Sequence, residues 1–232
     1  MPLILSIGFL VPRAAAQSDK YSKMAPVEQY LMERNAEILL ARSAAPDSIS
    51  SEATILVLGR QGYETAVRAK NGFVCMVERS WMEAFDSPEF WNPKVRGAEC
   101  LNRQAARSIV PIADLRTKMV MDGHSKAETV SAIKAAFENK QLPNLETGAM
   151  AYMMSKSAYL TDEGDHISCS LLPLWTVKIG VLAQRARQLY SSLVLLAEGT
   201  IPNERLPPIL VFALVLTNWS DGTAATHASR AD

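Results

Sequence analysis

Three short strand patterns in close succession constrain the fold more than any other feature of this sequence. Residues 53–59 form an apolar run rich in β-branched side chains, which is typical of a buried strand. Two more such segments follow, one on each side of Asn71-Gly72. Both central residues of a type I′ turn need a positive φ, which Asn and Gly tolerate. The pattern therefore predicts a hairpin over 63–78 within an antiparallel meander.

Helical patterns surround these strands in separate blocks. Residues 27–42 place apolar side chains near the i, i+3, i+4 rhythm of an amphipathic helix. A second helical pattern covers 102–122, with an interruption expected at Pro111 because proline cannot donate a helical hydrogen bond. Ser125 and Glu128 have the spacing of a capping box at the start of a third helix. Because strands do not alternate with helices, we expect an α+β fold in which an antiparallel sheet packs with a few helices.

The first sixteen residues read as a signal peptide. An uncharged apolar run at 2–11 precedes Ala14-Ala15-Ala16, so we expect cleavage after Ala16. The run is about half of the ~20 apolar residues that span a bilayer, and no transmembrane segment is expected in the mature chain. No Lys or Arg precedes the run, and a buried first strand or helix is the alternative. The expectation is an exported protein, periplasmic or secreted, with one domain over 17–232.

The charge balance excludes one class of function. The chain has 24 basic and 24 acidic residues, whereas nucleic-acid binding relies on clustered Lys and Arg. No nucleic-acid partner is expected, and other partners stay unknown. With 48% hydrophobic residues, the chain has enough apolar content for a soluble globular core.

Cysteine and histidine usage bears on disulfides and metals. Cys75 and Cys100 are 25 residues apart, and export would place them in an oxidising compartment, so a disulfide is expected, with two separately buried thiols as the alternative. The histidines are His124, His166 and His227, too few and too scattered for a metal site. We therefore expect neither a metal nor another cofactor.

Catalytic signals are weak. The sequence contains no nucleophile elbow, phosphate loop or dinucleotide fingerprint. Glu64, Glu78 and Arg79 flank the predicted hairpin and could line a cleft as acid, base or oxyanion partner, although such residues more often form a solvated ion pair. His166, close to several carboxylates, is the remaining weak candidate.

An aromatic cluster follows the third strand. Its members are Trp81, Phe85, Phe90 and Trp91. Stacked on a surface, these rings would suit a glycan or a peptide, whereas buried rings would form the core beneath a loop. Of these two alternatives, burial is favoured.

Several motifs resemble those of a family of uncharacterised exported bacterial proteins. The motifs are Tyr30-Leu31-Met32-Glu33-Arg34-Asn35, Leu56-Val57-Leu58-Gly59-Arg60, Asn71-Gly72-Phe73-Val74-Cys75-Met76-Val77-Glu78-Arg79-Ser80-Trp81, Pro88-Glu89-Phe90-Trp91-Asn92-Pro93, Met153-Met154-Ser155-Lys156 and Trp219-Ser220-Asp221-Gly222. The resemblance covers about 17–163 and 211–223 and implies no known activity. It also implies a His-Trp-His-Pro-His strand after the Met-Met-Ser-Lys motif, which this chain lacks.

The composition changes over the last third of the chain, where residues 168–217 hold twelve leucines and two acidic residues. Reading the codons of 165–188 two nucleotides later permits the Trp-Gly-Ala and Gly-Ser-Pro segments that the resemblance implies. We therefore infer a frameshift over roughly 165–210 that is later restored. It predicts a missing strand that leaves the edge at Met153 unpaired. The alternative is a native Leu-rich helix over 176–198.

Two classes of function stay open. The first is a noncatalytic exported protein with a binding or structural role. The second is a small periplasmic enzyme that could use a metal, with its histidine cluster degraded in this chain. Whether the chain is an enzyme at all is left open by the sequence.

Overall fold

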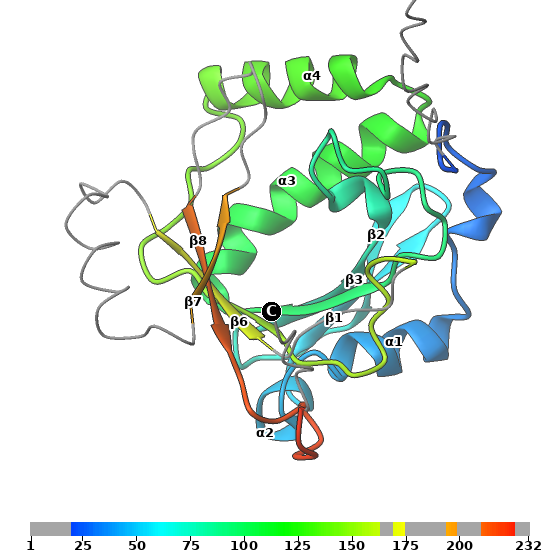
Figure 1. Cartoon of the computed structure of the whole chain (residues 1–232). Helices are drawn as coiled ribbons and strands as arrows, with labels where there is room; N and C mark the ends of the chain where they lie inside the picture. The colour runs from blue at the N-terminus through cyan, green and yellow to red at the C-terminus, as the bar shows by residue number, and fades with distance from the viewer. Residues whose placement is uncertain (1–19, 163–168, 175–193, 199–209, 226–232) are drawn as a thin grey trace, which may run out of the picture.

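The computed structural model describes residues 20–162, 169–174, 194–198 and 210–225, so the predicted signal peptide lies outside the described residues (Figure 1). The helices are η1 Val27–Gln29, α1 Arg34–Arg42, α2 Asp47–Ser50, η2 Ser80–Met82, α3 Arg103–Met121 and α4 Lys126–Glu138. The strands are β1 Thr54–Gly59, β2 Gly62–Val67, β3 Val74–Glu78, β4 Gly97–Leu101, β5 Ala151–Met153, β6 Cys169–Leu174, β7 Val194–Glu198 and β8 Leu210–Val215. Among the described residues, no helix has the length and apolar character to cross a membrane.

All described strands belong to one sheet, in the order β2-β1-β3-β4-β5-β6-β8-β7. Every neighbouring pair is antiparallel except β1 and β3, which are parallel. Helix α1 packs on one face, against β1, β3 and β4, and α3 crosses the opposite face with α4 packed on it (Figure 1). This arrangement confirms the predicted α+β class with a mostly antiparallel, helix-packed sheet.

The hairpin predicted over 63–78 is wrong in its pairing. Strand β1 lies between β2 and β3, and the hairpin is instead formed by β1 and β2 around Gly62, whose φ is 119°. The connection from β2 to β3 passes the start of β1, where Thr54 N donates to Phe73 O at 2.9 Å. The Asn71-Gly72 turn chemistry is real, since Gly72 has a φ of 85° and Asn71 Oδ1 accepts from Phe73 N. The turn therefore serves a crossover over β1.

The helix boundaries also differ in part from those predicted. Instead of one helix over 27–42, η1 ends at Gln29 and α1 begins at Arg34, because the Glu33 carboxylate accepts two main-chain N–H groups and caps α1. Helix α3 continues through Pro111, which removes one hydrogen bond without ending the helix. The predicted capping box of α4 is confirmed, with Ser125 and Glu128 satisfying each other's main-chain groups.

Two apolar clusters pack on the two faces of the sheet. The cluster under α1 includes Ile55, Val77 and both cysteines. Cys75 and Cys100 lie directly opposite each other on β3 and β4, with Cα atoms 3.9 Å apart and sulfur atoms at disulfide distance. The second cluster gathers side chains of α3 and α4 with those of the segment after β3. β3 and β4 contribute to the cluster under α1, and on the other face Met76 of β3 packs with Ala113 of α3 in a smaller cluster.

The structure contradicts the unpaired edge predicted at Met153. β6 pairs with β5 there, with Met153 opposite Cys169. The alternative of a Leu-rich helix over 176–198 is wrong for its last five residues, because Val194–Glu198 forms strand β7. Residues 175–193 lie outside the described residues. The physical reason is that the apolar segments here complete main-chain ladders with their neighbours, which β6, β7 and β8 do with one another. The origin of this segment by a frameshift stays a prediction.

Candidate functional site

The structure separates the two catalytic candidates that adjoin in sequence, Glu78 and Arg79. Successive side chains of a strand point to opposite faces of the sheet. Arg79, just past the end of β3, is fully buried and pairs with Glu37 of α1. Glu78 is partly exposed and interacts with Glu99 of β4 and Arg116 of α3. The two residues therefore belong to different clusters and do not line one cleft.

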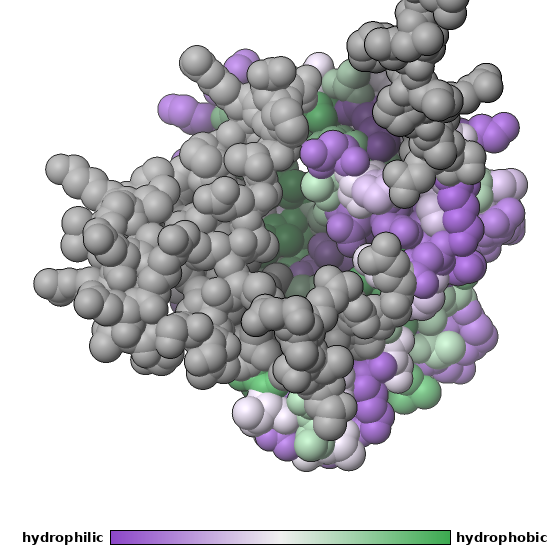
Figure 2. Space-filling view, in the orientation of Figure 1, coloured by the Kyte–Doolittle hydropathy of each residue, from purple (hydrophilic) through white to green (hydrophobic). Residues whose placement is uncertain are grey.

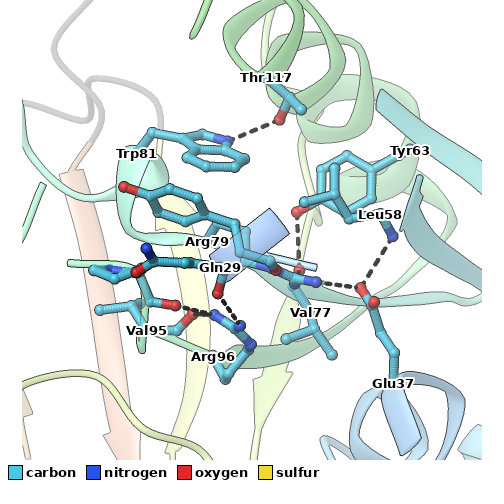
Figure 3. A network of polar contacts seen from close by, with 12 residues as sticks. Gln29, Glu37, Leu58, Tyr63, Val77, Arg79, Trp81, Val95, Arg96 and Thr117 are labelled. Atoms are coloured by element: carbon cyan, nitrogen blue, oxygen red, sulfur yellow. Dashed lines mark hydrogen bonds and ion pairs between the residues drawn. The ribbon is translucent and has the colours of Figure 1, made fainter. Parts of the chain in front are cut away.

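Arg79 and Glu37 close a gap in the sheet. The β1/β3 ladder has only two residue pairs, at the start of both strands, so later main-chain groups lack ladder partners. Leu58 N donates to Glu37 Oε1 at 3.0 Å, and Tyr63 OH donates to Val77 O at 2.8 Å (Figure 3). Arg79 Nη2 donates to the same Glu37 oxygen at 2.8 Å, and Nη1 donates to Val77 O. Side chains thus replace the missing backbone bonds.

This network continues into the segment before α1. Arg79 Nε donates to Tyr30 O at 2.7 Å, which fixes the chain between η1 and α1. Glu37 and Arg79 have exposed fractions of 1% and 0%, so no ligand in solvent can contact them. Each charge has a partner of opposite sign, and the guanidinium donates three hydrogen bonds. We assign the pair to stabilisation of the fold.

The aromatic cluster lies largely in the core. Trp81 and Phe90 are fully buried, Phe85 is 9% exposed and Trp91 is partly buried. Trp81 Nε1 donates to Thr117 Oγ1 of α3 at 3.0 Å (Figure 3). Of the two alternatives weighed from the sequence, the structure shows burial, so these rings do not form a stacking surface.

Glu78 and Glu99 form a hydrogen-bonded carboxyl pair on the α3 side of the sheet. Glu99 lies opposite Met76 in the β3/β4 ladder and Glu78 lies opposite Gly97, which makes the two carboxyl groups diagonal neighbours. Glu99 is only 4% exposed, and Glu78 keeps some exposure although protein atoms surround its carboxyl group. Burial raises the pKa of Glu78 to about 7. Burial, together with the adjacent Glu78 charge, raises the pKa of Glu99 well above its ordinary value.

The two carboxyl groups can share a hydrogen bond only while at least one of them keeps its proton. Burial and the adjacent Glu78 both favour the protonated form of Glu99, because two close carboxylates cannot both ionise cheaply in a buried site. That hydrogen bond and the charge of Arg116 act against burial and lower the pKa of Glu78. Glu78 is thus the carboxyl group that gains and loses a proton near pH 7.

Glu83 and Arg116 complete the surroundings of the pair, and we call Glu78, Glu83, Glu99 and Arg116 the carboxyl site. Burial raises the pKa of Glu83 and lowers that of Arg116 to about 10. The Arg116 guanidinium donates to Glu83 O and stacks on Phe85, with 4.0 Å between its central carbon and the ring centroid. The buried aromatic segment therefore holds the one cation that acts on Glu78 among the described residues.

The remaining sequence candidates lie elsewhere. Glu64 is an exposed partner of Arg34 beside the β1–β2 turn, where a shallow polar cavity of about 470 Å³ is lined by residues 59–64. His124 lies at the surface, 3.9 Å from Glu128, and His166 and His227 fall outside the described residues. Within the described ranges, no three His, Cys, Asp or Glu side chains are placed to hold a metal ion.

Sequence reasoning missed Glu99 and Arg116. A signal for Glu99 was present, because a single carboxyl group in the apolar segment Gly-Ala-Glu-Cys-Leu is unusual in a strand buried on both faces. Arg116 carried no comparable signal, because one arginine on an amphipathic helix is ordinary.

On the face drawn in Figure 2, hydrophilic residues cover much of the coloured surface, and hydrophobic residues are visible deeper, beside the atoms drawn in grey. Comparison of the chain with protein-family models, with curated proteins and with solved structures finds no match.

Proposed function

We propose that this chain is an exported protein in which the Glu78–Glu99 pair performs general acid–base chemistry, with Glu78 as the group that exchanges a proton with the substrate. The observation that supports the proposal is the hydrogen-bonded pair itself: one carboxyl group is buried and its pKa is raised well above the ordinary value, and the other is partly exposed with a pKa raised to about 7. A general acid or base works best when its pKa lies near the working pH. Strongly perturbed carboxyl groups of this kind concentrate at functional sites.

Each residue of the carboxyl site has a role in this proposal. Glu78 is the catalytic residue because it is the accessible member of the pair. Glu99 is a positioning residue, which holds the Glu78 carboxylate by a hydrogen bond from beneath. Arg116 carries the positive charge that can stabilise negative charge developing on a substrate oxygen. The reaction class is proton transfer or hydrolysis at a small polar substrate.

Export is supported by the amino-terminal sequence pattern and by the Cys75–Cys100 pair, because disulfides persist mainly in oxidising compartments. A noncatalytic binding role, the other expectation from the sequence, would have used the aromatic cluster. Three of its four rings are buried, so the acid–base role has the stronger structural support.

The first test is a pH titration of the glutamate side-chain carbons by NMR, with Glu78→Gln to assign the resonance. We expect Glu78 to titrate near pH 7, and a midpoint between 4 and 5 would refute the proposal. The second test measures hydrolysis of chromogenic nitrophenyl esters and glycosides. Any turnover at this site should follow the ionisation of Glu78 and fall by about 100-fold or more in Glu78→Gln.

The matched control is Glu138→Gln, which removes the same charge from the exposed end of α4. Its rates should equal those of the unmodified protein. Equal rates in Glu78→Gln and Glu138→Gln would show that turnover does not depend on the carboxyl site.

A further inference from the structure

The paired cysteines lie deep inside the folded sheet. Cys75 and Cys100 are both 0% exposed and belong to the central strands β3 and β4. Within the sheet, Ile55 of β1 lies beside Cys75 and Tyr152 of β5 lies beside Cys100. Solvent therefore does not reach either sulfur atom in the folded chain.

Helix α1 covers the cluster that contains both cysteines. The helix packs against β3 and β4 as well as β1, and its Ala41, also 0% exposed, shares one apolar cluster with Cys75 and Cys100. The buried ion pair of Glu37 with Arg79 ties the same helix to the end of β3. Apolar packing and this ion pair thus hold the cover in place.

Forming a disulfide requires more space than this arrangement provides. One protein thiolate attacks the disulfide of a donor, which forms a mixed disulfide and releases one donor thiolate. The second protein thiolate then attacks the protein sulfur of the mixed disulfide, and the other donor thiolate leaves. The protein loses two electrons and two protons, and the donor is reduced from a disulfide to two thiols. A donor sulfur must therefore reach Cys75 or Cys100, where the folded chain packs apolar side chains instead.

We propose that the Cys75–Cys100 bond forms before α1 closes over β3 and β4, so that the open chain, and not the folded protein, is the substrate of a disulfide donor. The thiolate, which is the reactive form, is also disfavoured in the apolar cluster and favoured in an open, solvated chain. Once α1 is in place, the same packing shields the bond from reductants. This proposal goes beyond the acid–base function and does not depend on it.

A bond formed early would restrict the register of the central strands. Cys75 lies directly opposite Cys100 in the β3/β4 ladder, although the two residues are 25 apart in sequence. A slip by one residue turns every side chain of a strand to the other face of the sheet, which would separate the two sulfur atoms. The bond therefore favours the observed register before the sheet is complete.

The experiment measures how fast the bond is reduced in the folded and in the unfolded chain. Cys169→Ala removes the third cysteine, so that a maleimide reagent which adds mass to free thiols reports on the pair alone. The oxidised protein is treated with dithiothreitol at pH 8, in buffer and in urea above the unfolding midpoint. We expect reduction in buffer to be slower by about 100-fold or more, because it waits for the chain to open. Peptide mapping of the unmodified chain gives the same comparison if the variant does not fold.

A second arm follows formation of the bond. Glutathione disulfide is added to the reduced chain either in urea, before dilution into folding buffer, or after refolding. We expect the bond to form in the first case and to be slower by about 100-fold or more in the second. A reduced chain that cannot refold without the bond also supports the proposed order. Similar rates in the two cases, or in the two reductions, would overturn the proposal.

Two controls separate the cover from general effects. Leu39, on α1, is 67% exposed, so Leu39→Cys in the Cys169→Ala protein adds a thiol that should react with maleimide equally fast with and without urea. Glu33→Ala removes the cap of α1 and should speed reduction in buffer about fivefold, whereas Ser125→Ala removes the cap of α4 and should change it less. Equal acceleration by both cap variants would overturn the role of α1 as the cover.

Discussion

Replacing Arg79 by Met should be one of the most damaging single substitutions in this chain. The side chain of Arg79 is 0% exposed and that of its partner Glu37 is 1% exposed, so the substitution leaves an uncompensated carboxylate in the core. Tyr30 O also loses its donor, and Val77 O retains only the hydroxyl of Tyr63. Breaking a buried ion pair from one side costs about 3–5 kcal/mol, and we expect Arg79→Met to fall in this range.

The control is Arg34→Met, which breaks an ion pair of the same charge types at the surface. Arg34 and Glu64 are about half exposed, and exposed pairs contribute about 0–1 kcal/mol. Urea unfolding at pH 7, followed by circular dichroism, gives the free energy of unfolding of both variants. If Arg79→Met lies within about 1 kcal/mol of Arg34→Met, the buried network does not stabilise the fold as argued.

A double variant tests whether the cost comes from the unpaired charge. Removing both groups in Glu37→Met/Arg79→Met eliminates the buried carboxylate and leaves the Leu58 N–H group without its acceptor. We expect the double variant to lose at least about 2 kcal/mol less than the sum of the two single variants, because the residues share one network. Additive losses would contradict the assignment of a coupled pair.

Three further predictions concern other parts of the fold. Replacing both Cys75 and Cys100 by Ala should lower the free energy of unfolding by about 3 kcal/mol, and an unchanged urea midpoint would show that no bond forms. Ser125→Ala removes the cap of α4 and should cost about 1 kcal/mol, to be compared with Ser131→Ala on the exposed face of the same helix. Raising the pH from about 5 to 7 should lower the stability by about 2 kcal/mol, because the folded chain keeps on Glu78 a proton that the unfolded chain releases near pH 4.5; Glu78→Gln should flatten this slope.

The positions of β1, β2 and β3 were predictable because each is a short apolar or β-branched run bounded by turn residues. Their pairing was not. Asn71-Gly72 supplies the same positive φ to a two-residue hairpin and to a crossover, and the crossover is fixed by contacts with other segments, such as Asn71 Nδ2 donating to Ile49 O. Local turn chemistry therefore left the order of the strands undetermined.

Only part of the candidate site could be predicted from the sequence, for a similar reason. Glu78 and Arg79 could be named from their position after a strand, but their partners Glu99 and Glu37 lie 21 and 42 residues away. Which carboxyl group meets which side chain depends on the β3/β4 register and on the face that α1 covers. Strand alternation then gives two adjacent residues opposite roles.

Those opposite roles lead to a last prediction, on Glu99. Arg79 is buried with its charge compensated, whereas Glu99 is buried opposite Met76 with one oxygen unpartnered, an arrangement that lowers the stability of the folded state. An apolar side chain of similar size would avoid this cost, so Glu99→Leu should raise the free energy of unfolding by about 1–2 kcal/mol at pH 8. The same change removes the hydrogen bond that holds Glu78 and should weaken any acid–base activity, the trade-off expected of a functional group in a core. A loss of stability in Glu99→Leu would instead identify the carboxyl pair as a structural hydrogen bond.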